Sequence, residues 1–198
     1  MDERPLRGRP RPLGPPRLER LHPADLDTDQ AGLHARIAGG PRRAQARVPL
    51  VDEHDRLLGP FGPMLLSPRI GDAVQQVGAA LRTDPDLPPR LRELAILTVA
   101  VHTGCAFEWS AHEEAAVEAG LDDDQLQALL DGREPGGLEP GELVGLQIVH
   151  TVLAGGGPDD ELHRRAESTL GRASLAALVW LTGYYAALAG ALAVFRPE

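Results

Sequence analysis

The chain alternates helix-like apolar patterns with short breaks rich in proline and glycine. From Ser67 onward, apolar residues recur at three- and four-residue spacing, which is the period of an amphipathic helix. Ser67 supplies a capping hydroxyl and Pro68 a proline at the first helical position, so this pair predicts where the helix begins. The apolar residues that share one face of it are Ile70, Val74, Val77 and Leu81.

More helices are predicted on both sides of this segment. A short one over residues 27–37 has Asp25 or Asp27 available as its N-cap. Downstream, glycine and proline breaks separate further periodic segments. These run from about 89 to 102, 105 to 119, 121 to 130, 139 to 154, 159 to 170 and 174 to 195. No run has the alternation of a β-strand and no repeat has a fixed period, so the sequence predicts an all-α helix bundle.

Composition supports helices and removes some functions. Hydrophobic residues make up 42% of the 198 residues and aromatic residues only 4%, so aliphatic side chains must fill the core. All 20 cationic residues are arginine, so the chain has no lysine to form a Schiff base. The formal charge of -9 argues against a nucleic-acid or anionic-membrane partner. The bias toward Arg, Ala, Gly and Pro is typical of a high-GC bacterial genome.

The domain organisation follows from the distribution of these patterns. Residues 1–20 lack periodicity and are rich in Pro and Arg, which predicts a disordered or extended N-terminal arm. The length of 21–198 suits a single helical domain. Residues 175–195 carry no charge over nearly a membrane-spanning length, but their Gly and Ala content favours a buried core or interface helix. The charged, Pro-rich start does not resemble a signal peptide, so we expect a cytoplasmic protein without a membrane partner.

Candidate chemistry gathers between residues 93 and 112. Glu93 lies in a strongly apolar helix, where a carboxylate is costly unless it is paired or functional. After a break at Gly104, the next helix carries Cys105, Glu108 and His112 at positions i, i+3 and i+7 of one face. Cys105 falls in the first helical turn, where the helix dipole favours a thiolate. His112 is one turn beyond Glu108, close enough to share a proton with it.

The spacing of Glu93, Cys105 and His112 resembles the motif E…C-x-x-C-x-x-x-H of the carboxymuconolactone decarboxylase/AhpD-like superfamily. Glu108 stands where that motif has its second cysteine, so an internal dithiol cycle is excluded. The chain is similar instead to a Glu-Trp-x-x-His branch, through Leu-x-x-Arg-x-Arg-Glu-Leu at 87–94 and further matches within 59–121. The resemblance implies an AhpD-like helix bundle in which a helical hairpin carries the site. It also implies chemistry without a cofactor, and homo-oligomers such as trimers, their multiples or dimers.

Our interpretation of the site is cofactor-independent acid–base catalysis on a small organic acid, lactone or activated carbonyl compound. Such a pair could serve a decarboxylase, lyase, isomerase or cyclase, with Glu93 and His112 transferring protons and Glu108 orienting the imidazole. One alternative is a one-cysteine peroxidase that uses Cys105. Another is a non-catalytic oligomeric binding scaffold. The candidate catalytic residues are Glu93, Glu108, His112 and Cys105, and the candidate substrate-binding residues are Trp109, Phe107, His102 and Tyr184.

Several of these residues also have a structural interpretation. His102 falls in the last turn of its helix, where a cation interacts well with the dipole. Trp109 and Phe107 could be core walls, and Tyr184 and its neighbour Tyr185 could serve core or oligomer packing. Two carboxylates and one histidine could also hold a metal ion, but the resemblance implies a site without one.

Overall fold

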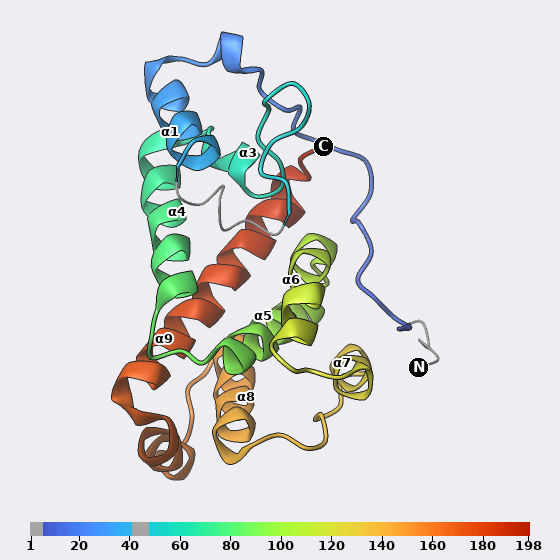
Figure 1. Ribbon diagram of the computed structural model, residues 1–198, viewed down its shortest axis with the longest axis vertical. Helices are drawn as coiled ribbons and strands as arrows, with labels where there is room; N and C mark the ends of the chain where they lie inside the picture. The colour runs from blue at the N-terminus through green and yellow to red at the C-terminus, as the bar shows by residue number, and fades with distance from the viewer. Residues whose placement is uncertain (1–5, 41–47) are drawn as a thin grey trace. The chain divides into compact units, whose positions relative to one another are not determined.

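The computed structural model describes residues 6–40 and 48–198, and within these ranges it contains helices and no strands (Figure 1). The elements are a 3-10 helix Pro23–Asp25 and the α-helices α1 Thr28–Ala38, α3 Phe61–Met64, α4 Pro68–Thr83, α5 Pro89–Thr103, α6 Ala106–Glu118, α7 Asp123–Leu130, α8 Pro140–Leu153 and α9 Asp160–Phe195. The all-α prediction is confirmed. The short helix α3 was not predicted, because its Gly- and Pro-rich sequence reads as a loop.

The helix ends follow the capping residues of the sequence. Asp27 caps α1 and accepts hydrogen bonds from the backbone N–H groups of Asp29 and Gln30. Asp122 forms a capping box with Gln125 at the start of α7. Each of these two N-caps satisfies backbone N–H donors that have no partner inside the helix, which is why Asp27 and Asp122 begin helices.

The chain divides into two compact units of contacting residues. Unit 1 contains residues 1–12 and 84–186, and unit 2 contains residues 13–83 and 187–198. The single domain predicted for 21–198 stays a prediction.

In unit 2, the close approach of α1, α3 and α4 depends on Gly71. A Cβ atom at Gly71 would lie 2.4 Å from the backbone oxygen of Met64 and 2.9 Å from Cδ2 of Leu33. Glycine therefore allows α4 to lie directly against the other two helices. The buried residues of α4 are Gly71, Gln75, Gly78 and Leu81.

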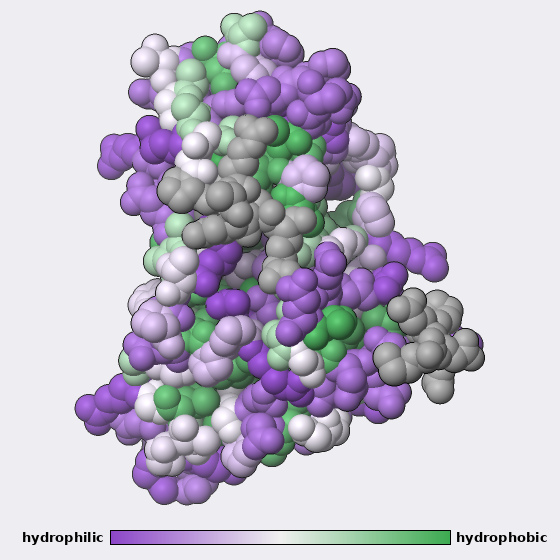
Figure 2. Space-filling view, in the orientation of Figure 1, coloured by the Kyte–Doolittle hydropathy of each residue, from purple (hydrophilic) through white to green (hydrophobic). Residues whose placement is uncertain are grey.

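Of the four residues in the apolar stripe seen in the sequence, Leu81 alone is buried in α4. Ile70 is 66% exposed and Val77 is 45% exposed, while Val74 is half-buried. The small residues on the neighbouring face permit closer packing than the branched side chains do, and this decides which face is covered. Figure 2 shows that apolar patches lie between the polar side chains on the visible face of the molecule.

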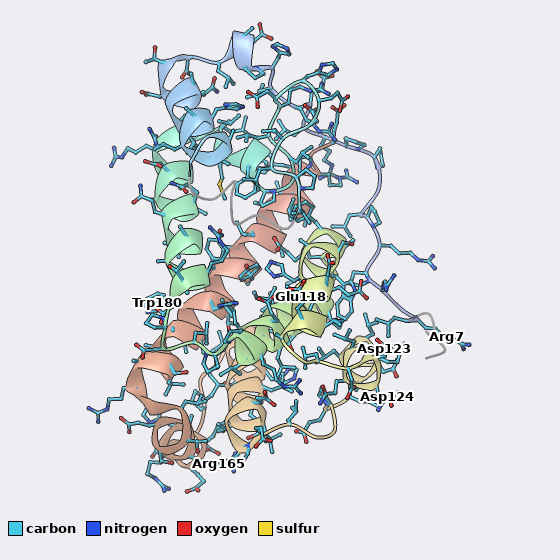
Figure 3. All side chains as sticks on the ribbon, in the orientation of Figure 1. Arg7, Glu118, Asp123, Asp124, Arg165 and Trp180 are labelled. Atoms are coloured by element: carbon cyan, nitrogen blue, oxygen red, sulfur yellow. The ribbon has the colours of Figure 1, made fainter. Side chains whose placement is uncertain are left out.

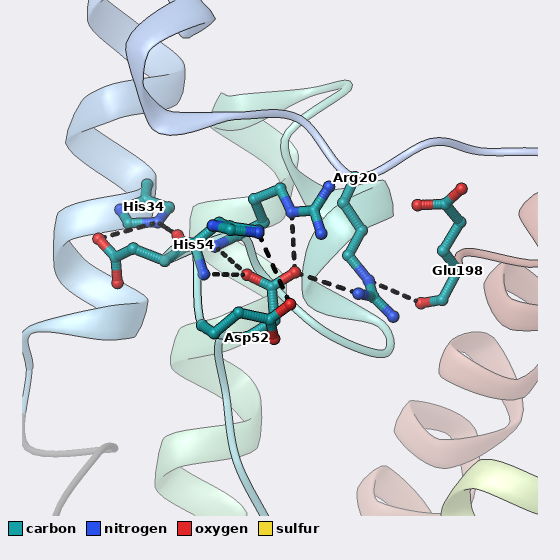
Figure 4. Close-up of polar contacts among 8 residues, drawn as sticks. Arg20, His34, Asp52, His54 and Glu198 are labelled. Atoms are coloured by element: carbon teal, nitrogen blue, oxygen red, sulfur yellow. Dashed lines mark hydrogen bonds and ion pairs between the residues drawn. The ribbon is translucent and has the colours of Figure 1, made fainter.

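A polar network around Asp52 holds the turn at residues 52–56 in place (Figure 4). The carboxylate of Asp52 accepts hydrogen bonds from Nη1 of Arg20 at 3.1 Å and Nε of Arg56 at 2.8 Å. It also accepts from the backbone N–H groups of His54 and Arg56. Arg20 in turn donates to the backbone oxygen of Glu198 at 3.0 Å. The carboxylate is fully satisfied by these donors, so we interpret this network as structural.

Unit 1 is built on a hairpin of α5 and α6, with α7 and α8 packed against it (Figure 1). Arg90 of α5 binds Glu142 of α8 at 2.7 Å and Gln125 of α7 at 2.9 Å, so one side chain joins three helices. The hydrophobic core of the unit consists of Leu94, Leu97, Ala100, Trp109, Ala116, Leu121, Leu126, Leu129 and Leu146.

The described part of the N-terminal arm lies partly against this unit. Leu6 packs on the hydrophobic core, and the backbone of Arg7 exchanges two hydrogen bonds with the side-chain amide of Gln127. Arg9 pairs with Glu113 of α6 at 2.6 Å. Residues 1–5 lie outside the described residues, and the disordered or extended arm stays a prediction.

The last helix, α9, combines the two C-terminal segments expected from the sequence. Gly171 has φ 78° and ψ 162°, a non-helical conformation that bends the helix at the predicted break. Among the described residues, α9 alone is long and apolar enough to cross a membrane by length and composition, a test that core helices of soluble proteins also pass. Trp180 is 70% exposed on it (Figure 3). The absence of a membrane partner stays a prediction.

Candidate active site

The turn between α5 and α6 places the candidate residues on two adjacent helices. Gly104 ends α5 in the left-handed conformation, with φ 67° and ψ 24°. Its N–H donates to the backbone oxygen of Val101, and the N–H of Cys105 donates to that of Ala100. This pair of bonds is a Schellman motif, which needs a residue that tolerates positive φ. Cys105 then serves as the N-cap of α6, so Gly104 brings the second helix back beside the first.

Glu93 and His112 meet across this hairpin. Oε2 of Glu93 lies 2.8 Å from Nδ1 of His112. Oε1 of Glu93 accepts a hydrogen bond from Nε of Arg92 at 3.1 Å. Glu93 is only 5% exposed. The buried carboxylate is therefore paired on both oxygens, which explains how it is accommodated in an apolar helix.

These contacts determine the ionisation of Glu93. Burial by itself raises the pKa of Glu93, but the hydrogen bond and charge of His112, together with those of Arg92, outweigh it and hold the pKa below its ordinary value. Glu93 is thus a carboxylate near neutral pH, and it accepts the Nδ1–H of His112. In the neutral imidazole, Nε2 then carries the lone pair.

The Nε2 side of His112 faces two further groups. The hydroxyl of Tyr185 in α9 lies 3.2 Å from Nε2, and the two rings make an edge contact with centroids 5.2 Å apart. Oε2 of Glu108 lies 3.7 Å from Nε2, beyond hydrogen-bond distance. Glu93 therefore orients the imidazole, and Tyr185 contacts its basic nitrogen.

Glu108 is a buried acid with an unsatisfied oxygen. The residue is 3% exposed, and its Oε1 has no hydrogen-bond partner among the described residues. Burial raises the pKa of Glu108 to about 7, and the positive charge that His112 can carry offsets only part of this effect. Both protonation states of Glu108 are accordingly populated near neutral pH, as a proton donor and acceptor requires.

Cys105 shares the site but is not activated. Burial raises the pKa of the Cys105 thiol above its ordinary value. Hydrogen bonds from the backbone N–H groups of Phe107 and Glu108 lower this pKa. Burial and the negative charge of Glu108 raise it by a larger amount. The expectation that the helix dipole would favour a thiolate is wrong here, because burial and a neighbouring carboxylate oppose it.

The structure brings Tyr185, rather than Tyr184, onto His112. Tyr184 contacts the ring of Tyr185 edge-on, with centroids 5.2 Å apart. Both tyrosines were candidates from the sequence, but sequence periodicity alone does not determine which of two adjacent helical positions faces α6. A role for Tyr184 in substrate binding stays a prediction.

The other candidate substrate-binding residues lie in different surroundings. Trp109 is 1% exposed and belongs to the hydrophobic core of unit 1. Phe107 is half-buried at the start of α6. His102 is exposed at the end of α5. The pKa of His150 is lowered mainly by the burial of His150 and further by the charge of the nearby His102. Roles in substrate binding for these three residues stay predictions.

Protein groups lie close to both sides of the His112 imidazole. Both nitrogens of the imidazole face protein groups, Glu93 on one side and Tyr185 and Glu108 on the other. Over residues 6–40 and 48–198, no group of three or more His, Cys, Asp or Glu side chains has an arrangement that could hold a metal ion.

Comparison with known proteins identifies a family for the region that contains this hairpin. Residues 68–151 match the model of the carboxymuconolactone decarboxylase family, and the match runs from the start of α4 to near the end of α8. Neither the comparison with curated proteins nor the comparison with solved structures gives a match.

Proposed function

Since residues 68–151 match the model of the carboxymuconolactone decarboxylase family, we propose that the chain is a cofactor-independent acid–base enzyme. Its substrate would be a small lactone, organic acid or activated carbonyl compound. The observation that carries the proposal is the 2.8 Å contact between Glu93 and Nδ1 of His112, beside the buried acid Glu108. Proton transfer at carbon can be catalysed by a positioned imidazole as the base together with an acid whose pKa lies near the operating pH.

In this mechanism Glu93 prepares His112 as the base. The carboxylate accepts the Nδ1–H, so Nε2 is the nitrogen that receives a proton, and the resulting imidazolium is stabilised by the same contact. The sequence suggested Glu108 for this orienting role. The distances support Glu93 instead, at 2.8 Å against 3.7 Å for Glu108.

Glu108 is then available as the acid. Its pKa of about 7 keeps a proton on part of the population at neutral pH. Its unpaired Oε1 has hydrogen-bonding capacity that a bound substrate would use. We therefore assign Glu108 the delivery of a proton to the reacting carbon.

The reaction step shared by these compounds is formation of an enolate. When a proton leaves the carbon beside a carbonyl group, the C–H electron pair moves to the carbonyl oxygen and the base, His112, takes up the proton. When carbon dioxide leaves instead, the C–C electron pair takes the same route. In both cases Glu108 protonates the resulting carbanion, and Glu108 regains its proton from the imidazolium or from solvent.

Two related compounds test the proposal. We expect the protein to release carbon dioxide from carboxymuconolactone, or to incorporate deuterium from D₂O into the ring of an enol-lactone that lacks the carboxyl group. Carbon dioxide release identifies a decarboxylase, and deuterium incorporation alone identifies an isomerase-type enzyme. NMR spectroscopy of the reaction mixtures measures both. If both compounds remain unchanged in the presence of the protein, the proposed substrate class is wrong.

A one-cysteine peroxidase using Cys105 is the alternative with a specific residue behind it. The raised pKa of Cys105 favours the acid–base proposal, because peroxide reacts with the thiolate and not with the thiol. We expect Cys105→Ser to retain lactone turnover, and wild-type Cys105 to react with peroxide no faster than a free thiol does. Rapid formation of a sulfenic acid, detected by mass spectrometry after dimedone trapping, would favour the peroxidase.

The remaining parts of the proposal concern the setting of the enzyme. We propose a small-molecule substrate, a homo-oligomeric assembly, which the resemblance to the family implies, and a cytoplasmic location. A non-catalytic binding scaffold is the third possibility. It differs in a simple observation, since a scaffold would bind one of the lactones without changing it.

A further inference from the structure

The phenol of Tyr185 occupies the nitrogen that the mechanism requires as a base. We propose that Tyr185 carries the proton between His112 and the substrate, so that Glu93, His112 and Tyr185 form one proton relay. This inference rests on the acid–base function proposed above. It assigns the outer end of the proton path to a residue 73 positions away from His112 in the sequence.

The geometry places the phenol at the end of the imidazole opposite Glu93. Glu93 contacts Nδ1 at 2.8 Å, and the Tyr185 hydroxyl lies 3.2 Å from Nε2. The ring planes of His112 and Tyr185 stand at 87°, an edge arrangement that keeps the hydroxyl near the nitrogen. Tyr185 is 5% exposed, so this contact forms in a setting where solvent competes little.

The ionisation of Glu93 fixes the direction of the Tyr185 hydrogen bond. Because Glu93 is a carboxylate, Nδ1 of His112 carries a hydrogen and Nε2 of the neutral ring is an acceptor. The Tyr185 hydroxyl therefore donates to Nε2 in the resting enzyme. The phenol occupies this lone pair, so a substrate that used Nε2 directly would have to displace it.

The same contact also suits the protonated state. Once Nε2 carries a hydrogen, the imidazolium donates to the phenol oxygen, and no side chain has to move. A hydroxyl that is donor to the neutral ring and acceptor from the charged ring is what a relay needs. Glu108, at 3.7 Å from Nε2, does not have this property.

The proton transfer balances without a further reactant. The Tyr185 proton moves to Nε2 of His112 while the phenol oxygen takes the proton from the substrate carbon, and the C–H electron pair becomes the enolate. The charge of the imidazolium is stabilised by Glu93. Glu108 protonates the carbanion as described above, and His112 returns to its neutral state when the imidazolium gives its proton to Glu108 or to solvent.

Kinetics of Tyr185→Phe on the enol-lactone test the relay. We expect kcat to fall by about 10²-fold, the low end of the general acid–base range, with little change in KM. The substrate proton is bound to carbon and does not exchange with solvent, so the relay moves one solvent-exchangeable proton, that of the phenol, in this step. The solvent isotope effect on proton abstraction in H₂O/D₂O mixtures should therefore be linear in the D₂O fraction for the wild type and should fall toward one in Tyr185→Phe. Thr182→Val is the matched control, because it removes a buried hydroxyl from the same helix, one that donates to the backbone oxygen of Leu178. A Tyr185→Phe enzyme with the kcat and the solvent isotope effect of the wild type would overturn the relay.

A second measurement needs no substrate and so separates this inference from the proposed function. In protein labelled with ¹⁵N-histidine, the Nε2 resonance of His112 should move toward that of a nitrogen without a hydrogen bond in Tyr185→Phe, and stay in place in Thr182→Val. If neither lactone reacts but the resonance moves as expected, the acid–base function on lactones fails while the His112–Tyr185 proton contact is supported. If the resonance does not move, the relay is wrong whatever the lactones show.

Discussion

His112→Ala is expected to lower kcat on the responsive lactone by about 10² to 10⁴-fold, the contribution of a positioned general base. His112 is the residue of the site that contacts Glu93 and Tyr185 and also lies one helical turn from Glu108. Its removal breaks the path between the carboxylate and the substrate. His112→Gln should be equally inactive, because the amide can hydrogen-bond to Glu93 but cannot take up a proton.

Glu93→Gln tests the same mechanism and is expected to lower kcat on this lactone by a similar factor. The amide cannot stabilise an imidazolium as the carboxylate does, so the base loses its driving force. Because the two residues act as a unit, the double variant should be no slower than the slower single variant. Multiplicative losses would show instead that Glu93 and His112 act independently.

The control for both variants is His163→Ala, which removes an exposed histidine from α9. It should keep the activity of the wild type, and circular dichroism should show equal helicity for all variants. Full activity in both His112→Ala and Glu93→Gln would reject the acid–base mechanism.

Local signals in the sequence predicted the hairpin and most of the acid–base group. Gly104 was expected to end a helix, and its left-handed conformation confirms this. The sequence interpretation named Glu93 and His112 as the proton-transfer pair, and the structure places the two side chains 2.8 Å apart, while their catalytic role stays a prediction. These inferences worked because capping and helical periodicity depend on residues only a few positions apart.

The features that the sequence did not reveal depend on packing between distant segments. Adjacent residues of a helix point about 100° apart, so choosing between Tyr184 and Tyr185 requires knowing which face of α9 meets α6. The buried face of α4 depended on how closely Gly71 allows its neighbours to approach. The ionisation of Cys105 depended on burial, which outweighs the helix dipole assumed from its position.

Glu108→Gln is expected to remove a pH dependence of stability that the wild type carries. The folded-state pKa of Glu108 is raised from its ordinary 4.5 to about 7, so between these values the folded state holds a proton that the unfolded state has lost. The contribution of this proton to stability is fully present below pH 4.5 and is lost as the pH rises through about 7. At about 1.36 kcal/mol for each pKa unit, the loss amounts to about 3 kcal/mol.

The measurement is the free energy of unfolding in urea for wild type and variant at pH 5 and pH 8. The amide introduced by Glu108→Gln cannot ionise, so the stability of the variant relative to the wild type should rise by about 2.5 kcal/mol between the two pH values, whatever the cost of the substitution itself. Glu114→Gln is the control, since it removes an exposed carboxylate from the same helix and should leave the pH dependence unchanged. A variant whose stability follows the wild type across this range would show that Glu108 ionises normally. In that case the enzyme would lack the neutral-pH acid that the mechanism assigns to it.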